Sequence, residues 1–455
     1  MKKELSRTTN MTEGEPFGIL IRFAVPIFIG NIFQQIYNMV DTMVAGYNLG
    51  DGAIAAIGAT TSIFMVVIDV AIGMNNGFAL VSTRKFGAGQ MDEFKRATAG
   101  MMVLDLVFSI ALTILSLIFL GPLMRLMNTP DSIYSDAYSY ISVLCGGIIC
   151  TQAFNMFSAI LRSVGNSIVP LYFLIIACVA NIGLDLFMVI VLQLGVMGTA
   201  LATVVAQGLS AVLSGIYLMK KYRDIMPGRE DFRYDRDLWR DLISNGLAMA
   251  FMFTVVDIGT MFYQAGNNKL GEVIIASQTA GRRIVFLLMS PMSSISMAAS
   301  TFVGQNWGAG KYDRIKEGIR KAILIELGWG VFSTVVGYSL GKALVVFLTG
   351  TSNEEIISNA VLCVRIHVPF FGILGILFVL RNSLQAMNRK FAAVFSSVLE
   401  LGMKVLAYYW IIPTYGFVGT CVTEPFTWVI MTVFLGTAYM INRKKMYAPA
   451  EADAV

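Results

Sequence analysis

Long apolar runs separated by short polar stretches make up nearly the whole chain. A helix needs about 20 mostly apolar residues to cross the hydrocarbon core of a membrane, and each run reaches that length. The sequence therefore predicts an all-α membrane protein with twelve transmembrane helices. The predicted spans lie near residues 17–40, 53–80, 97–120, 134–159, 168–191, 196–219, 240–264, 272–299, 319–341, 356–381, 391–413 and 418–441.

The first apolar run carries a polar stripe that ends in an acid. Gln34, Tyr37 and Asn38 precede Asp41 by seven, four and three residues, so the four side chains share one face of a helix. An ionised group at the centre of a membrane helix costs about 2.5–3.5 kcal/mol on insertion scales, so it is usually kept for a functional site. We expect a site around Asp41; the alternative is a packing face satisfied by neighbouring helices.

Composition supports a membrane protein and excludes an ordinary soluble domain. Of the 455 residues, 56% are hydrophobic and only 14% are charged, against about 25% charged in soluble proteins. The five cysteines all fall in predicted spans without a C-x-x-C spacing, which favours small buried side chains, and we expect no cofactor. The first fifteen residues lack a short apolar core with a cleavage site, so no removable signal peptide is expected.

Lysine and arginine gather in alternate loops, and this bias predicts the orientation. Basic loops normally stay in the cytoplasm. We therefore expect both termini in the cytoplasm of a multi-pass protein of the cell inner (plasma) membrane. The same loops explain the net charge of +5, so no nucleic-acid partner is expected. The basic residues on this side are Lys2, Lys3, Arg7, Arg84, Lys85, Lys95, Arg96, Arg162 and those within 220–240, 311–321, 389–390 and 443–445.

The chain contains an internal repeat. The stretch that begins Phe86-Gly-Ala-Gly reappears 221 positions later as Trp307-Gly-Ala-Gly, and the same offset places Asp105 on Glu326. Two copies of a six-helix unit therefore form two pseudo-symmetric lobes, with a substrate site expected between the repeats near the membrane midplane. The predicted parts are an amino-terminal lobe (1–219), a cytoplasmic linker (220–239), a carboxy-terminal lobe (240–441) and a cytoplasmic tail (442–455).

Three stretches together resemble the multidrug and toxic compound extrusion (MATE) family. They are Phe23-Ala-Val-Pro26-Ile, Val40-Asp41-Thr-Met-Val-Ala-Gly46 and Gly304-Gln-Asn-Trp-Gly-Ala-Gly-Lys-Tyr-Asp-Arg314. The resemblance covers nearly the whole chain. It implies a secondary antiporter that expels organic cations and other amphipathic compounds in exchange for inward movement of Na⁺ or H⁺.

The resemblance also implies a cation-coupling site. The acidic position of the family's first helix falls on Asp41, the Asn and Asp of its fifth helix fall on Asn181 and Asp185, and a sixth-helix threonine matches Thr203. Asn181 and Asp185 are four residues apart and share a face that can meet Asp41. Two adjacent carboxylates need a cation between them or a shared proton, and their oxygens with the Asn181 amide would also suit Na⁺. The alternative is a hydrogen-bonded core network that only locks the amino-terminal lobe.

This sequence departs from one branch of the family. Sodium-coupled NorM-like members carry a Glu in the seventh helix and an Asp in the tenth, and those positions are Thr254 and Leu374 here. The carboxy-terminal cation site of that branch is therefore not expected. Two roles fit Asp257, one turn beyond Thr254: a cation contact, or an ion pair with Arg282 or Arg283.

We predict that polar and soft side chains at membrane depth bind the substrate. Arg283 resembles an arginine of many bacterial family members, and we expect it to face the cleft and pair with an acid. Methionine offers a surface that adapts to varied ligands. The predicted substrate-binding residues are Gln34, Tyr37, Asn38, Ser62, Met65, Asn155, Asp257 and Arg283.

The remaining charged groups in predicted spans have weaker assignments. Glu400 and Lys404 are four residues apart with the acid first, the favourable order for an ion pair within a helix. His367, the single histidine, is interpreted as a packing residue, with a proton relay as the alternative. Glu424 has no neighbour that the sequence can name.

These observations predict a cation-coupled exporter of amphipathic or cationic drugs and toxic organic compounds, not an enzyme. The expected partners are small organic substrates and membrane lipids, and the expected state is a monomer. A flippase for a lipid-linked precursor is the nearest alternative, but its cleft would need many Arg and Lys residues for a pyrophosphate, and apart from Arg282 and Arg283 the sequence offers few. A membrane-embedded transferase would need a D-D-x-x-D cluster, which the sequence lacks. A channel is a further alternative, but the repeat and the buried acids favour alternating access.

Overall fold

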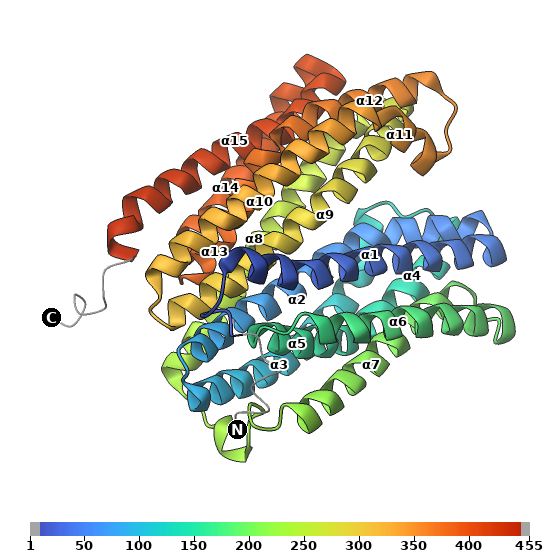
Figure 1. Cartoon of the computed structure of the whole chain (residues 1–455). Helices are drawn as coiled ribbons and strands as arrows, with labels where there is room; N and C mark the ends of the chain where they lie inside the picture. Colours follow the sequence, from blue (N-terminus) through green and yellow to red (C-terminus); the bar gives the residue numbers. More distant parts are fainter. Residues whose placement is uncertain (1–9, 447–455) are drawn as a thin grey trace. The chain divides into compact units, whose positions relative to one another are not determined.

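The computed structural model describes residues 10–446 and the side chains of residues 10–441. Every regular element in this part of the chain is helical, and the predicted all-α fold is confirmed (Figure 1). The basic residues Lys2, Lys3 and Arg7, and positions 447–455 of the predicted tail, lie outside the described residues.

The α-helices are α1 (Pro16–Leu49), α2 (Asp51–Gly87), α3 (Met91–Leu126), α4 (Asp131–Gly146), α5 (Ile148–Ser163), α6 (Ile168–Leu186), α7 (Gly195–Lys221), α8 (Arg236–Asn268), α9 (Glu272–Gly308), α10 (Tyr312–Ser339), α11 (Gly341–Thr349), α12 (Glu354–His367), α13 (Phe371–Ala386), α14 (Lys390–Leu406) and α15 (Ile412–Met446). Short π-helical turns, η2 (Phe187–Val191) and η5 (Ala407–Ile411), follow α6 and α14, and 3₁₀ turns occur at η3 (Arg229–Phe232) and η4 (Val368–Phe370).

Twelve membrane crossings follow from these helices. Ten continuous helical stretches of the described chain are long and apolar enough to span, and α4 with α5, bent by 42°, forms an eleventh. The stretch Lys390–Ile441 has 52 residues, which would extend about 78 Å at 1.5 Å per residue, far more than one crossing of about 30 Å. It is broken at Gly416, whose φ of 57° and ψ of −137° are not helical. It therefore contains two spans, and the predicted number of twelve is confirmed.

The chain divides into two compact units. The amino-terminal unit contains Pro26–Phe251, and the carboxy-terminal unit contains Met11–Val25 and the chain from Met252 onward. Two helices are divided between the units: α1 at its internal proline, Pro26, and α8 after Phe251.

The predicted repeat is visible in the backbone. Glycines with positive φ recur at the same 221-residue offset in three places, where helices end or begin. After both Gly-rich stretches the chain turns back with the same backbone hydrogen bond, from Gln90 N to Lys85 O (3.2 Å) and from Lys311 N to Asn306 O (2.9 Å). Identical turns at identical spacing confirm two copies of one helical design. The three glycine pairs are Gly50 with Gly271, Gly89 with Gly310, and Gly195 with Gly416.

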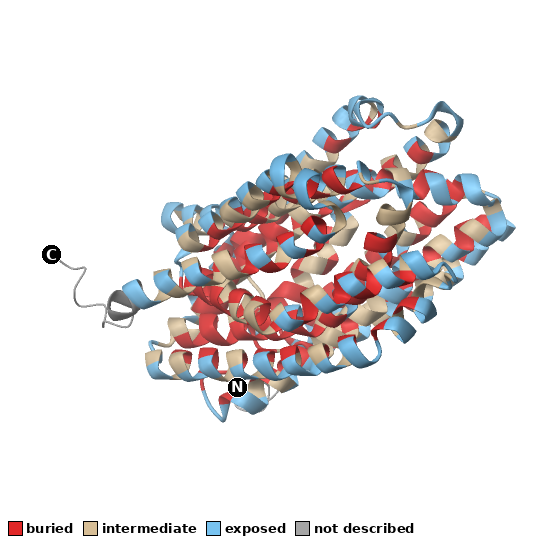
Figure 2. Cartoon of the chain, turned by 90° about the horizontal axis from the view of Figure 1, so that it is seen from above, coloured by how far each residue is buried: buried red, intermediate tan, exposed pale blue. Residues whose placement is uncertain are grey.

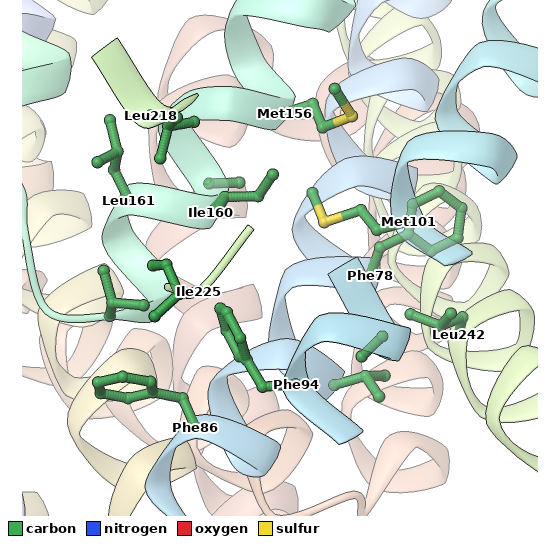
Figure 3. Packing of buried hydrophobic residues seen from close by; sticks show 14 of the residues in the cluster. Phe78, Phe86, Phe94, Met101, Met156, Ile160, Leu161, Leu218, Ile225 and Leu242 are labelled. Atoms are coloured by element: carbon green, nitrogen blue, oxygen red, sulfur yellow. The ribbon is translucent and has the colours of Figure 1, made fainter. Parts of the chain in front are cut away.

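A large apolar cluster holds the amino-terminal unit together (Figure 3). It joins α2, α3, α5, α7 and the first part of α8 through residues that are almost completely buried. Close backbone contact adds to this packing: a Cβ added to Gly77 on α2 would lie 2.4 Å from the carbonyl oxygen of Asn245 on α8. The labelled members include Phe78, Phe94, Met101, Ile160, Leu218 and Leu242.

The first described residues are hydrogen-bonded to the carboxy-terminal unit. Met11 N donates to Gln305 Oε1 (2.9 Å), and Asn306 Nδ2 donates to Met11 O (3.1 Å). Arg314 Nη1 also donates to Gly14 O (2.9 Å). These bonds link the residues before α1 to the second Gly-rich stretch, which explains why Met11–Val25 belongs to this unit.

Many helices have one buried side and one exposed side (Figure 2). Much of the exposed side consists of large apolar residues. On α3, for example, Leu106, Val107, Ile110, Ile114 and Ile118 are each exposed by 46–61%. Exposed aliphatic side chains in this number would be unfavourable in water and are typical of a surface that faces lipid. The chain is a multi-pass membrane protein.

Candidate functional site

The structure brings together the four residues predicted to couple a cation, which we call the Asp41 cluster: Asp41 on α1, Asn181 and Asp185 on α6, and Thr203 on α7. Asp41 is 8% exposed and faces the other three residues, while Asn181 and Asp185 are completely buried. Thr203 Oγ1 lies 3.2 Å from Asp41 Oδ2 and 3.1 Å from the carbonyl of Thr199. All four belong to the amino-terminal unit.

The cluster contains more oxygen atoms than hydrogen-bond donors. Asp41 Oδ2 accepts a hydrogen bond from Thr203, and the carboxyl groups of Asp41 and Asp185 face each other. Asp41 Oδ1 and both oxygens of Asp185 lack a hydrogen bond of good geometry among the described residues. The amide of Asn181 lies close to Asp41 but also lacks a hydrogen bond of good geometry there. Buried polar atoms are nearly always satisfied in proteins, and exceptions deserve a functional explanation. A proton or a small cation is the ligand that such oxygens can bind.

Local helix geometry explains how α6 presents its pair. Asn181 and Asp185 lie on one face, and the π-helical turn η2 begins two residues after Asp185. Turns of this kind are frequent at functional sites because they shift the register of side chains. The equivalent turn η5 in the second repeat follows α14 but has no matching acid pair, so the Asp41 cluster belongs to one repeat only.

Two tyrosines complete the surroundings of the cluster. Tyr37 is buried next to Thr203 and close to both carboxylates, on the polar face of α1 that the sequence predicts. Tyr140 on α4 also lies near Asp41 and Asp185. Sequence reasoning missed Tyr140, because nothing in its local pattern shows that α4 comes near α1 and α6.

The other predicted substrate-binding residues of this unit are more dispersed. Gln34 is partly buried, whereas Asn38, Ser62 and Met65 are exposed. Asn155 donates to Gln152 Oε1 (3.4 Å) in a second buried polar group. The predicted stripe on α1 therefore has a buried part, Tyr37 with Asp41, and an exposed part, Asn38.

That second polar group surrounds Asp105 on α3. Asp105 Oδ1 accepts hydrogen bonds from Asn75 Nδ2 and Gln152 Nε2, each at 3.4 Å. Its repeat counterpart Glu326 on α10 is completely buried, and its two oxygens have no hydrogen-bond partner among the described residues. Glu326 lies so close to Gly375 that an added Cβ there would be 2.4 Å from the Cβ of Glu326.

In the carboxy-terminal unit three charged side chains form what we call the Glu424 cluster: Arg282 on α9, His367 on α12 and Glu424 on α15. Arg282 Nη1 lies 3.8 Å from Glu424 Oε1, and His367 Nε2 lies 3.4 Å from Glu424 Oε2. The sequence named each residue but not their contact, because they come from three separate helices.

The acid partner expected for Arg283 is not found. Its side chain is exposed and makes no ion pair within the described residues, and the buried acid lies instead against the preceding residue, Arg282. One helical position turns a side chain by about 100°, so neighbouring arginines cannot share a face. Asp257 on α8 is partly buried.

The predicted pair of Glu400 and Lys404 is confirmed. Lys404 Nζ lies 2.9 Å from Glu400 Oε1, and Arg381 Nη2 lies 3.3 Å from Glu400 Oε2. Lys404 also donates to Thr260 Oγ1 (3.0 Å), which ties α14 to α8. These contacts support a structural role for the two residues.

No group of three or more His, Cys, Asp and Glu side chains that could hold a metal occurs in the part of the chain that the structure describes. The Asp41 cluster has two carboxylates and an amide. This donor set suits a weakly held, exchangeable Na⁺ or a proton better than a permanently bound transition metal.

The twelve spans, the repeated helical unit and a buried carboxylate pair together define a polytopic membrane transporter. Residues 26–187 and 248–410 both match the MatE family model, in two segments that begin 222 residues apart. The chain belongs to the MatE family. Members of this family are transporters, and the protein is not an enzyme.

Individual proteins agree with this assignment. The chain is 25% identical over 335 residues to the probable multidrug resistance protein YoeA of Bacillus subtilis, covering 72% of each chain. It is 23% identical over 400 residues to an FAD transporter of Shewanella oneidensis, covering 86% of this chain and 87% of that one. A multidrug resistance MATE family transporter in an outward-facing conformation has the same fold, with a TM-score of 0.89 at 20% identity over 97% of this chain and 100% of the other.

Proposed function

We propose that this protein is a cation-coupled antiporter that exports amphipathic or cationic organic compounds across the cell inner membrane, with both termini in the cytoplasm. Inward movement of H⁺ or Na⁺ through the Asp41 cluster would drive export. The observation that supports this most strongly is the buried pair of carboxylates, Asp41 and Asp185, on two membrane helices with three unsatisfied oxygens. Relatives named as multidrug resistance proteins support the substrate class.

The charge of the Asp41 cluster explains how it would couple to transport. Two buried carboxylates repel each other unless a proton or a cation lies between them. Binding of the cation therefore stabilises a conformation that keeps the two acids together, and its release stabilises one in which they separate or gain water. A substrate that binds the second conformation more tightly is then exchanged for the cation. The strength of this coupling is limited by the difference between the affinities of the substrate for the two conformations.

Each residue has a separate part in this proposal. Asp41 and Asp185 bind the cation with their oxygens. Thr203 donates to Asp41 when no cation is bound and supplies an oxygen when one is, because a hydroxyl both donates and accepts. Asn181 provides an amide oxygen from the same face of α6 as Asp185.

Replacing Thr203 with valine tests the hydroxyl. We expect export to fall about 10-fold or more, because a hydrogen bond to a charged group contributes roughly 1.5–3 kcal/mol. Thr203→Ser keeps the hydroxyl and should retain most activity. The measurement is the initial rate of ethidium export from cells with equal amounts of each variant in the membrane. Equal rates for valine, serine and the native residue would remove Thr203 from the site.

Transport in liposomes across pH and Na⁺ identifies the coupling ion. We expect ethidium movement to follow an imposed gradient of one cation, H⁺ or Na⁺, and to stop when that gradient is collapsed by an ionophore. Movement driven only by the ethidium gradient, unchanged by either cation, would contradict coupling and indicate a uniporter. Empty liposomes and liposomes with the Asp41→Asn variant serve as controls.

A second candidate is export of a compound that carries a phosphate or pyrophosphate. The match to an FAD transporter over 86% of this chain favours this candidate, and a flippase for a lipid-linked precursor would need the same chemistry. A transported pyrophosphate needs cationic partners. Adding FAD to the same liposomes separates the two: an exporter specific for cations should show no competition, whereas an exporter of phosphate compounds should show FAD displacing ethidium.

A further inference from the structure

We propose that the Glu424 cluster is a proton-binding site of the carboxy-terminal unit, in which one proton is held between His367 Nε2 and Glu424 Oε2. This site shares no residue with the Asp41 cluster and belongs to the other unit. It therefore goes beyond the coupling proposed above, and its test does not require that transport be coupled to any cation.

The hydrogen bond on the far side of the ring determines which nitrogen can change its protonation. His367 Nδ1 lies 2.7 Å from the carbonyl oxygen of Cys363. A carbonyl can only accept, so Nδ1 donates and carries its proton in both charge states of the ring. Cys363 Sγ, 3.7 Å from the same nitrogen, leaves this assignment unchanged. Nε2 is therefore the position that gains or loses a proton.

The atom facing Nε2 is a carboxylate oxygen. Glu424 Oε2 lies 3.4 Å away, and an ionised carboxylate can only accept a hydrogen bond. Without a proton between them, two lone pairs face each other in a buried place. A proton on either atom turns this repulsion into a hydrogen bond, and its loss lets the two atoms move apart. His367 and Glu424 thus bind one proton as a pair.

Arg282 makes the deprotonated state possible. Its Nη1 lies 3.8 Å from the other oxygen of Glu424, so the carboxylate keeps a positive partner when the proton leaves. The cluster then has a net charge of zero, and of plus one when the proton is bound. A buried carboxylate with no partner would be strongly unfavourable. Because the carboxylate is compensated in both states, the proton can leave and return.

Other titratable groups lie near the cluster. Lys404 on α14 faces Glu424 but is held by Glu400 at 2.9 Å. On α8 the hydroxyl of Tyr263 donates to the carbonyl of Thr420 (2.8 Å). Cys421 on α15 lies next to Cys363 on α12, and both are free thiols. Among the described residues, Glu424 Oε2 is the titratable atom that faces His367 Nε2, whereas the Cys363 thiol lies on the Nδ1 side of the ring.

The three members of the cluster are buried to different degrees. The side chain of His367 is 1% exposed, whereas those of Glu424 and Arg282 are 13% and 17% exposed. The ring of Trp428 packs against the imidazole with centroids 5.7 Å apart. His367 is therefore the most buried of the three side chains.

His367 is the only histidine of the chain, which makes a direct measurement possible. Full-length protein carrying a tag without histidine is labelled with ¹⁵N-histidine, placed in lipid nanodiscs and followed by NMR between pH 5 and 10. We expect Nδ1 to stay protonated throughout and Nε2 to change its protonation within this range. An imidazole that keeps one state over the whole range would overturn the proposal and leave His367 as a packing residue. This test uses the native protein, so it does not depend on a variant that folds.

Two substitutions test whether Glu424 and Arg282 affect the protonation of His367. They are expected to shift its titration midpoint in opposite directions. Glu424→Gln removes the negative partner and should move the titration midpoint of His367 to lower pH by about one unit or more. Arg282→Gln removes a positive neighbour and should move the midpoint to higher pH. Lys342→Gln, which removes a positive charge from the exposed pair with Glu354 in the same unit, is the control and should cause no shift. Midpoints that move in the same direction, or not at all, in the two well-folded variants would contradict the proton site.

Discussion

Replacing Asp41 with asparagine is expected to abolish efflux, lowering the rate about 100-fold or more, while the protein still reaches the membrane. The substitution keeps the shape of the side chain but removes one of the two charges of the buried pair. The cluster can then no longer bind a cation strongly enough to change the balance between conformations, and couplings of this kind typically amount to about 5–150-fold. The measurement is resistance to ethidium and its accumulation in cells with and without the protein.

The control for Asp41→Asn is a charge change outside the cluster. Asp51, an exposed acid at the start of α2, becomes asparagine in a matched variant and should keep native efflux. The amount of protein in the membrane and its thermal stability are measured for both. Native resistance in cells with Asp41→Asn would refute the assignment of the coupling site.

The largest effect on stability is expected for Gly77→Ala. The added Cβ would lie 2.4 Å from the carbonyl oxygen of Asn245 and 2.6 Å from the Cα of Gly246, both backbone atoms of α8. Backbone cannot move aside as a flexible side chain can, so α2 and α8 must separate and part of the apolar cluster of the amino-terminal unit is lost. Overpacking of this kind typically costs about 1–3 kcal/mol and more where backbone shifts. The expected result is a lower melting temperature in detergent and less monodisperse protein.

The same helix offers a matched control for Gly77→Ala. A Cβ added to Gly58, also on α2, meets nothing within 4 Å. Gly58→Ala should therefore be neutral or slightly stabilising, because alanine is a better helix former than glycine by about 1 kcal/mol. Equal melting temperatures for the two variants would show that α2 and α8 do not pack as closely as described.

The number and place of the spans could be predicted from the sequence because a helix that crosses lipid needs apolar side chains. Each crossing must be apolar over its full length, and most predicted runs fall within one continuous helical stretch, including the run near 391–413 that merges with the next. The runs near 134–159 and 319–341 instead cross from α4 into α5 and from α10 into α11. The repeat was also readable, because it is carried by glycines at turns with positive φ, such as Gly89 and Gly310, which few other residues can replace. The sequence has no comparable pattern that predicts the bend between α4 and α5.

The Asp41 cluster was predictable for a different reason. Asn181 and Asp185 are four residues apart, so helical geometry places them on one face, and the resemblance to the MATE family linked them to Asp41. The Glu424 cluster was not predictable in the same way. Its three members come from α9, α12 and α15, and no periodicity relates residues on different helices. For this reason the sequence placed an acid beside Arg283, whereas the acid lies beside Arg282.

The two units therefore contain different buried charges on the same helical design. The amino-terminal unit has an acid pair with a hydroxyl and an amide, and the carboxy-terminal unit has an acid between an arginine and a histidine. We propose that the first arrangement binds H⁺ or Na⁺, and that the second, which already contains a fixed positive charge, binds only a proton.

The most direct test of coupling measures cation and substrate together. Liposomes containing the native protein start with no cation gradient, and an ethidium gradient is imposed while internal pH and Na⁺ are followed with separate dyes. We expect ethidium moving one way to drive H⁺ or Na⁺ the other way, and Asp41→Asn with Asp185→Asn to stop both movements. Ethidium transport with no opposing cation movement, or unchanged exchange in the double variant, would contradict this expectation.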